Sequence, residues 1–212
     1  MNFDRVAPYY QLIERVTAGN AAQKCRTTLL GYLQNKRNIL LLGEGNGRFL
    51  ETLLQVAPAA RITVVDSSPR MMTLLRQRMD KQGVSLERVK LVEADVRDWV
   101  ITPKVYDAMV TNFFLDCFRP VELQSLIHRL AESIREDGLW LIADFREPPQ
   151  LMRRVRAKVI LKLMYGFFRR TTKLSAKRLT APDEHLEDAG FRLQERELQS
   201  LGLMHADVWR KT

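Results

Sequence analysis

The chain has 212 residues, of which 46% are hydrophobic and 28% are charged. This is enough apolar material for the core of one domain, and we expect a single domain over 1–212. The composition excludes a mostly disordered chain, a collagen-like repeat and a disulfide scaffold. The two cysteines and three histidines show no metal-ligand spacing, so we expect no metal site. With neither a basic-then-apolar leader nor a membrane-length apolar run, we expect a cytoplasmic location.

The net charge of +9 is concentrated in one segment. Residues 146–178 contain eleven Lys or Arg and one acid, Glu147, which gives that segment +10 and leaves −1 for all other residues together. Basic character is therefore local, and we do not expect the rest of the chain to bind polyanions such as nucleic acid.

The hydrophobic pattern alternates between helices and strands along most of the chain. Apolar spacing predicts helices at 9–18 and 20–35, and we treat residues 1–36 as an N-terminal helical cap. The expected strands are 38–42, 61–65, 89–92, 105–110 and 139–143, and the helices between them are 47–56, 68–82 and one that starts at 119 and includes Ile134 in its apolar row. This last helix is expected to end before Asp137-Gly138.

The last third of the chain differs from this alternation. A basic helix is expected at 150–170, inside an insertion at 146–179, and a short helix at 180–189 with Thr180 and Asp183 in capping-box spacing. Strands at 191–198 and 203–209 have a short connection, so they should form an antiparallel hairpin. The pattern as a whole predicts a doubly wound, Rossmann-like α/β fold with seven mostly parallel strands.

A glycine-rich loop follows the first expected strand. Gly43, Gly45 and Gly47 lie between that strand and a helix, where small residues let the backbone approach a ligand. Asp66 ends the second strand, where an acid can accept hydrogen bonds from ribose hydroxyls; the alternative is that it only caps the following turn. The dinucleotide-binding fingerprint is Gly-x-Gly-x-x-Gly. Counted from Gly43, it puts Arg48 in the position of the third glycine, and counted from Gly45 it puts Leu50 there, which disfavours a dinucleotide cofactor.

These residues resemble the class I S-adenosylmethionine-dependent methyltransferases, and within them the small-molecule enzymes of quinone biosynthesis. The resemblance covers 39–47, Asp66, 93–96, 111–114 and 186–191 in the family's order. It implies S-adenosylmethionine as cofactor, with the following binding residues: Gly43, Glu44, Gly45, Asn46 and Gly47 near the methionine part, Asp66 and Ser67 at the ribose, Asp95 and Val96 at the adenine, Asn112 and Phe113 near the methyl group, and Tyr10 from a segment that can fold over the cofactor. The family more often has Asp or Gly in the position of Glu44.

Methyl transfer from a sulfonium needs alignment and exclusion of water, and a base only when the acceptor carries a proton. Asp116 and Asp144 follow the fourth and fifth expected strands and are the candidate catalytic residues; the alternative is that each is a loop cap or an ion-pair partner. No histidine ends either strand, so we do not expect a histidine base. The acceptor is expected to be a small, partly apolar molecule.

The basic insertion allows several interpretations. Leu151, Val155, Val159 and Leu163 form a row that could close as a lid over the acceptor. The helix could instead contact an anionic membrane surface, bind RNA phosphates, or have an ordinary solvated charged face. An RNA-modifying methyltransferase is the alternative function, although Asn112 is followed by Phe113 and Phe114 rather than by two prolines. A non-catalytic S-adenosylmethionine-binding protein is a third interpretation. Oligomeric state stays open.

Overall fold

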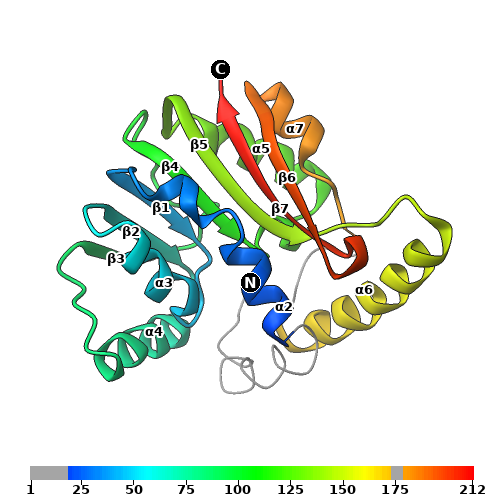
Figure 1. Ribbon diagram of the computed structural model, residues 1–212, viewed down its shortest axis with the longest axis horizontal. Helices are drawn as coiled ribbons and strands as arrows, with labels where there is room; N and C mark the ends of the chain where they lie inside the picture. The colour runs from blue at the N-terminus through cyan, green and yellow to red at the C-terminus, as the bar shows by residue number, and fades with distance from the viewer. Residues whose placement is uncertain (1–18, 173–178) are drawn as a thin grey trace.

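A single seven-stranded sheet forms the centre of the molecule (Figure 1). The computed structural model describes residues 19–172 and 179–212, so the expected helix at 9–18 and Tyr10 lie outside the described residues. The strands are β1 Asn38–Leu42, β2 Arg61–Asp66, β3 Val89–Glu93, β4 Tyr106–Asn112, β5 Ile134–Phe145, β6 Phe191–Gln199 and β7 Met204–Lys211, in the order β3-β2-β1-β4-β5-β7-β6. Only β7 runs opposite to the other six strands, which confirms the expected fold class and hairpin.

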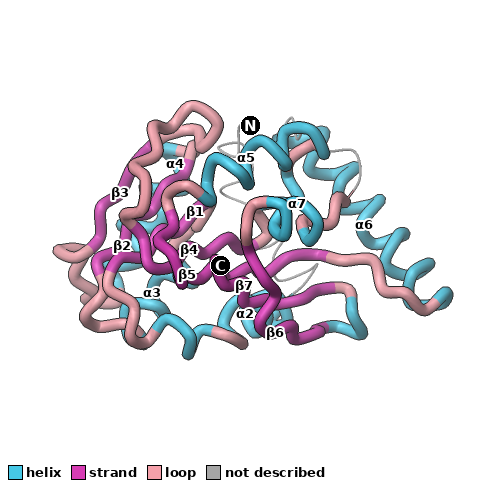
Figure 2. Tube along the Cα trace, turned by 90° about the horizontal axis from the view of Figure 1, so that it is seen from above, coloured by secondary structure: helices cyan, strands magenta, loops and turns pink. Residues whose placement is uncertain are grey.

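Helices cover both faces of the sheet (Figure 2). One apolar cluster joins one face to α2 Gly19–Thr27, α3 Arg48–Val56, α4 Pro69–Lys81 and part of α6 Leu151–Thr172. The opposite cluster joins the other face to α5 Pro120–Ala131 and α7 Asp183–Asp188. Alternate residues of β1 belong to opposite clusters, Ile39 and Leu41 to the first and Leu40 and Leu42 to the second. A strand buried on both faces explains why its sequence is apolar throughout.

The expected helix at 20–35 is wrong in its second half. Helix α2 ends at Thr27, and a short 3-10 turn, η1 Leu30–Leu33, follows. The hydroxyl of Thr27 donates to the carbonyl of Gln23 at 3.0 Å, and that of Thr28 donates to the carbonyl of Lys24 at 2.7 Å. Threonine hydroxyls that bond to the preceding turn in this way compete with helix continuation.

Helix α5 is shorter than expected and β5 is longer. The helix ends at Ala131, where the hydroxyl of Ser133 donates to the Leu130 carbonyl at 2.7 Å. Ile134 is therefore not part of the helix; it begins β5 and pairs with Tyr106 of β4. Asp137, with a φ of 59°, and Gly138 lie within β5 at an irregularity in its pairing with β4. The sequence Asp137-Gly138, which is typical of a turn, thus forms a bulge inside a long strand.

The expected capping box at Thr180 does not form. Helix α7 begins at Asp183, after Pro182, and no side chain caps it. Because the residue before a proline avoids the helical conformation, Ala181 cannot begin this helix easily. In the basic helix, the row of Leu151, Val155, Val159 and Leu163 is exposed. The interpretation of this row as a lid stays a prediction.

The strand order places β1 between β2 and β4, so the chain reverses its winding direction at β1. In open α/β sheets, ligands bind at the carboxyl ends of the strands beside such a reversal. The loops after β1, β2, β3 and β4 meet at this edge, and they include the residues that the sequence singled out.

Candidate functional site

The loop after β1 depends on glycine at two positions that border the cleft. Gly43 and Gly45 have φ values of 65° and 71°, a left-handed conformation that favours glycine. A Cβ atom at Gly43 would lie 2.3 Å from Cδ2 of Phe114, whereas one at Gly45 would meet no atom closer than 4.0 Å. The Phe114 ring therefore lies directly against the loop at Gly43, and the loop remains open at Gly45.

Glu44 supports this loop from behind. Its Oε1 accepts hydrogen bonds from the backbone N–H groups of Phe49 and Leu50, both at 2.9 Å, at the start of α3. Burial raises the pKa of Glu44 to about 7, against the lowering effect of these hydrogen bonds. The side chain of Glu44 thus caps α3. Glu44, Asn46 and Gly47 do not line the cleft, and their contact with the methionine part of a cofactor stays a prediction.

Asp66 connects the first two loops. Its Oδ2 accepts from the N–H of Gly45 at 3.0 Å, and its Oδ1 accepts from the N–H of Ser68 at 2.9 Å. The turn-capping role considered from the sequence is therefore real, but Asp66 and Ser67 also line the cleft. Since each carboxylate oxygen can accept more than one hydrogen bond, the same carboxylate can also accept from a bound ligand.

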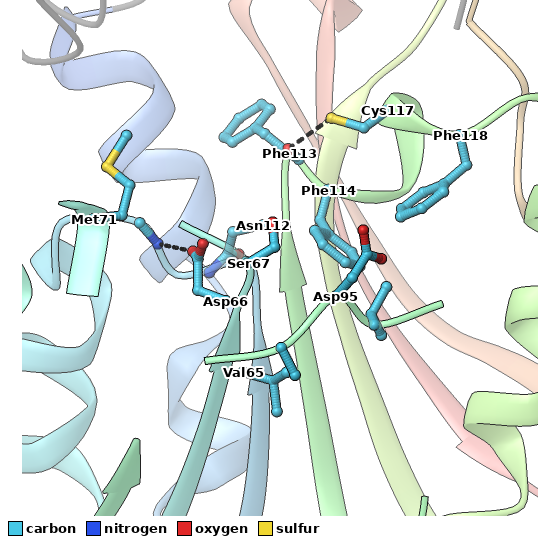
Figure 3. A pocket seen from close by; sticks show the side chains of 14 residues that line it. Val65, Asp66, Ser67, Met71, Asp95, Asn112, Phe113, Phe114, Cys117 and Phe118 are labelled. Atoms are coloured by element: carbon cyan, nitrogen blue, oxygen red, sulfur yellow. Dashed lines mark hydrogen bonds between the residues drawn. The ribbon is translucent and has the colours of Figure 1, made fainter. Parts of the chain in front are cut away.

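Asp95 and Val96 line the opposite side of the cleft, after β3. The carboxylate of Asp95 accepts from the Nε of Arg97 at 2.9 Å and from its terminal nitrogen at 2.5 Å. These hydrogen bonds lower the pKa of Asp95 to about 2, so it is ionised at neutral pH. Figure 3 shows the Phe114 ring between Ser67 and Asp95.

The end of β4 contains Asn112 and Phe113. Asn112 is buried and lines the cleft, and its Nδ2 has no hydrogen-bond partner among the described residues. Phe113 has a φ of 51°, and its N–H donates to the Ala143 carbonyl of β5 at 2.7 Å. An unsatisfied buried amide is costly unless a ligand accepts its hydrogen bond. Asn112 therefore indicates where a polar atom of a ligand belongs.

A second cavity lies beyond the aromatic pair Phe113 and Phe145. The two rings are 4.8 Å apart between centroids; Phe113 lines the first cleft and Phe145 the second cavity. The remaining residues that line the second cavity come from the starts of α5, α7 and β7, from β6, and from both ends of the insertion: Pro120, Arg146, Glu147, Leu179, Thr180, Ala181, Pro182, Asp183, Arg196 and His205. The hydroxyl of Thr180 is buried without a partner among the described residues.

The two predicted catalytic acids line neither cavity. Asp144 accepts from the backbone N–H of Asp116 at 3.2 Å and from its neighbour Phe145 at 2.8 Å. Burial raises its pKa well above the usual value, and the nearby carboxylates of Asp116 and Asp207 raise it further. The structure thus places Asp144 as a brace between the ends of β4 and β5. The loop-cap alternative describes it better than the catalytic one.

No histidine ends β4 or β5, as the sequence indicates, but the fold brings one from β7 to this edge. Because β7 runs antiparallel, its beginning lies beside the end of β5, and His205 pairs with Asp144. The Nδ1 of His205 lies 2.9 Å from Oδ1 of Asp207. Arg196 bonds to both oxygens of Asp207, at 2.8 and 2.6 Å, and to Asp183 at 2.8 Å. Burial raises the pKa of Asp207, but Arg196 and His205 lower it more, so the carboxylate stays ionised.

One signal for this group was present in the sequence. His205 and Asp207 are two residues apart in a strand, so their side chains point to the same face.

In the part of the chain that the structure describes, no group of three or more His, Cys, Asp or Glu could hold a metal ion. None of the helices described here combines the length and apolar character that a bilayer-spanning helix requires.

Comparison with known proteins agrees with this geometry. Residues 39–138 match the family described as a methyltransferase domain. The malonyl-[acyl-carrier protein] O-methyltransferase of Acetivibrio thermocellus is 28% identical over 149 residues, 68% of this chain and 48% of that protein. The demethylmenaquinone methyltransferase of Thermus thermophilus is 24% identical over 170 residues, 77% of this chain and 75% of that protein.

A solved structure shares the fold. The 1,6-didemethyltoxoflavin-N1-methyltransferase of Burkholderia thailandensis, with bound S-adenosylhomocysteine, superposes with a TM-score of 0.68 at 20% identity over 98% of this chain and 85% of that one. The methyltransferase-domain match over 39–138 and the named relatives support a class I S-adenosylmethionine-dependent methyltransferase with S-adenosylmethionine as its cofactor, and the solved structure shares the Rossmann-like fold. The chain spans about half the length of the Acetivibrio relative.

Proposed function

We propose that the chain transfers a methyl group from S-adenosylmethionine to a small, partly apolar acceptor bound in the second cavity. The observation that supports this most is the contact between Phe113 and Phe145, at 4.8 Å, which makes the two cavities neighbours across one aromatic wall. The relatives' names point to carrier-bound, quinone-like and heteroaromatic acceptors. We therefore expect a small acceptor of the phenolic or quinol-like kind.

The residues of the first cleft fit the cofactor. Asp66, at the end of β2, would accept hydrogen bonds from the ribose hydroxyls, and Asp95 with Val96 would hold the adenine. Gly45, where the loop is open, gives the methionine part access to the backbone of the loop. The unpartnered Nδ2 of Asn112 supplies a donor for a polar atom of the ligand. Because Glu44 caps α3, its charge is expected to act on the cofactor only at a distance.

When bound, the cofactor supplies a methyl carbon already activated by its sulfonium. The work of the chain is then to align the acceptor for in-line attack and to keep water out. Phe113, Phe114 and Phe118 line the cleft with aromatic surface, and Phe145 extends this surface into the second cavity. We expect the basic insertion to act as a wall of that cavity through Arg146, Glu147 and Leu179.

An acceptor hydroxyl must lose its proton during transfer, and we assign this role to His205. Oδ1 of Asp207 lies 2.9 Å from Nδ1, outside hydrogen-bond geometry, and its negative charge favours a proton on that nitrogen, which would leave Nε2 as the base. Arg196 fixes Asp207 in place through two hydrogen bonds. The hydroxyl of Thr180, buried on the same cavity, would orient the acceptor. Asp144 and Asp116 are proposed to position the β4 and β5 ends.

Calorimetric titration with S-adenosylmethionine, with NAD as the control, tests the cofactor site first. A panel of phenolic and quinol-like compounds, followed by mass spectrometry for the added methyl group, then tests the activity. Cofactor binding with no methylated product from any acceptor would contradict catalysis and favour a non-catalytic binding protein. Methylation of bulk RNA in place of the panel would favour the RNA-modifying alternative.

A further inference from the structure

Helix α6 is apolar on two opposite sides. Its inner side contacts the core through Ala157 and Leu161, which are 2% and 4% exposed, and through the half-buried Ile160 and Met164. Its outer side consists of large apolar residues that face solvent: Leu151, Met152, Val155, Val159 and Leu163, with exposed fractions between 55% and 86%. An ordinary surface helix buries one apolar stripe and exposes polar residues on the other side.

The outer residues form one continuous stripe. Leu151, Val155, Val159 and Leu163 follow one another at four-residue spacing, and each step turns about 40° around the helix. The stripe is therefore roughly 120° wide over three turns. Among the described residues, five of the ten large exposed hydrophobic side chains lie on this one helix. Such a concentration marks a contact surface, whereas single exposed apolar residues need no explanation.

Basic side chains border both edges of the stripe. Lys158 and Lys162 come three residues after Val155 and Val159, so they lie next to the stripe on one side. Arg156 comes four residues after Met152 and borders the other side. All three are exposed. Among the described residues, their ion pair joins Lys158 to Glu147 at 3.8 Å on the surface, where such pairs contribute little.

The position of α6 suits an external partner. Figure 1 shows the helix at the periphery, beyond the end of the sheet that holds β6 and β7, and running back toward α2. The insertion that contains it has a charge of +10, opposite in sign to an acidic surface. Apolar residues flanked by Lys and Arg are the pattern of a helix that lies in the interface of an anionic membrane.

We propose that the outer side of α6 docks the protein on a bilayer with anionic lipid headgroups. The apolar stripe would enter the boundary between headgroups and acyl chains, and Arg156, Lys158 and Lys162 would contact lipid phosphates. RNA would bind the basic residues but would leave the five large apolar side chains in water. The apolar stripe therefore favours a membrane over RNA as the partner. The proposal does not depend on the identity of the methyl acceptor.

Cosedimentation with lipid vesicles tests this surface without cofactor or acceptor. Vesicles of phosphatidylserine in phosphatidylcholine should bind the full chain at least tenfold more tightly than phosphatidylcholine alone, and added salt should weaken the binding. Replacing both lysines, by Lys158→Gln and Lys162→Gln, should weaken it about 30-fold. The triple variant Val155→Ser, Val159→Ser and Leu163→Ser should lower the affinity for the same vesicles by at least about tenfold.

Matched controls separate this surface from general effects. Arg76→Gln with Lys90→Gln removes the same charge from α4 and β3, and Val100→Ser with Val121→Ser removes exposed apolar residues elsewhere; both pairs should bind vesicles like the parent. Unchanged calorimetric affinity for S-adenosylmethionine confirms that a variant is folded. If the serine variant fails this folding check, vesicle binding by the lysine variant still tests whether the outer side of α6 contacts the membrane. No vesicle binding by the parent, or binding to bulk tRNA that the serine variant retains in full, would overturn the proposal.

Discussion

The contact between Gly43 and Phe114 predicts a large effect from one methyl group. In Gly43→Ala the new Cβ would lie 2.3 Å from Cδ2 and 2.9 Å from Cε2 of the Phe114 ring, at a φ of 65°. Left-handed backbone costs alanine about 1–2 kcal/mol, and overpacking adds about 1–3 kcal/mol. We expect a loss of about 2–5 kcal/mol in the free energy of unfolding, together with weaker binding of S-adenosylmethionine.

Gly45→Ala is the matched control, because Gly45 has nearly the same φ, 71°, and open space around its Cβ position. It should lose only the backbone part, about 1–2 kcal/mol. Urea unfolding followed by tryptophan fluorescence measures both variants, provided that the slope with urea is unchanged. Adding Phe114→Ala to each variant should relieve Gly43→Ala and not Gly45→Ala. Equal destabilisation by the two alanines would refute the ring contact.

Three further changes test the site. Asp66→Ala should abolish binding of S-adenosylmethionine in calorimetry while Asp98→Asn, on the exposed surface of the next loop, leaves it unchanged; normal affinity in Asp66→Ala would remove that residue from the site. Because burial raises the pKa of Glu44 from 4.5 to about 7, the native state binds this proton more tightly than the unfolded state, and its contribution to stability is lost as the pH rises through that range. In the parent, this group should lower the free energy of unfolding by about 3 kcal/mol as the pH rises through that range, and Glu44→Gln should abolish that decrease. Identical curves of unfolding free energy against pH for variant and parent would contradict the burial of this charge. His205→Gln should reduce turnover of a hydroxyl acceptor at least about 100-fold with cofactor affinity unchanged, whereas a parental pH–rate profile in that variant would rule out His205 as the base.

The sequence predicted the strands, the glycine loop and Asp66 because each is a local feature. Buried parallel strands are apolar runs, and the loop residues are fixed by their position between a strand and a helix. The prediction for Ile134 is wrong because its apolar side chain satisfies either a helix or a strand. The choice depends on its pairing with Tyr106, which lies 28 residues away.

The roles of single side chains were harder to predict. Glu44 looked like a cofactor contact, but its carboxylate caps α3, and only the turn geometry shows this. Asp144 ends a strand as a catalytic residue would, yet its oxygens accept from two backbone N–H groups. The order of the sequence does not place His205 beside β5, because that position depends on the antiparallel direction of β7. The spacing in α6 was recognised, but not which side faces the core.

The edge position of β6 has a consequence for His205. Arg196, which clamps Asp207, belongs to this outermost strand, and the pairing of β6 with β7 is irregular between Leu193 and Glu195. Edge strands open more readily than central ones, and each opening would release Asp207 from its clamp. The arrangement of His205 and Asp207 should then loosen whenever β6 opens, since among the described residues only Trp209 Nε1, at 3.2 Å, still donates to Asp207. Amide hydrogen exchange along this strand would measure how long the second cavity keeps this arrangement between such openings.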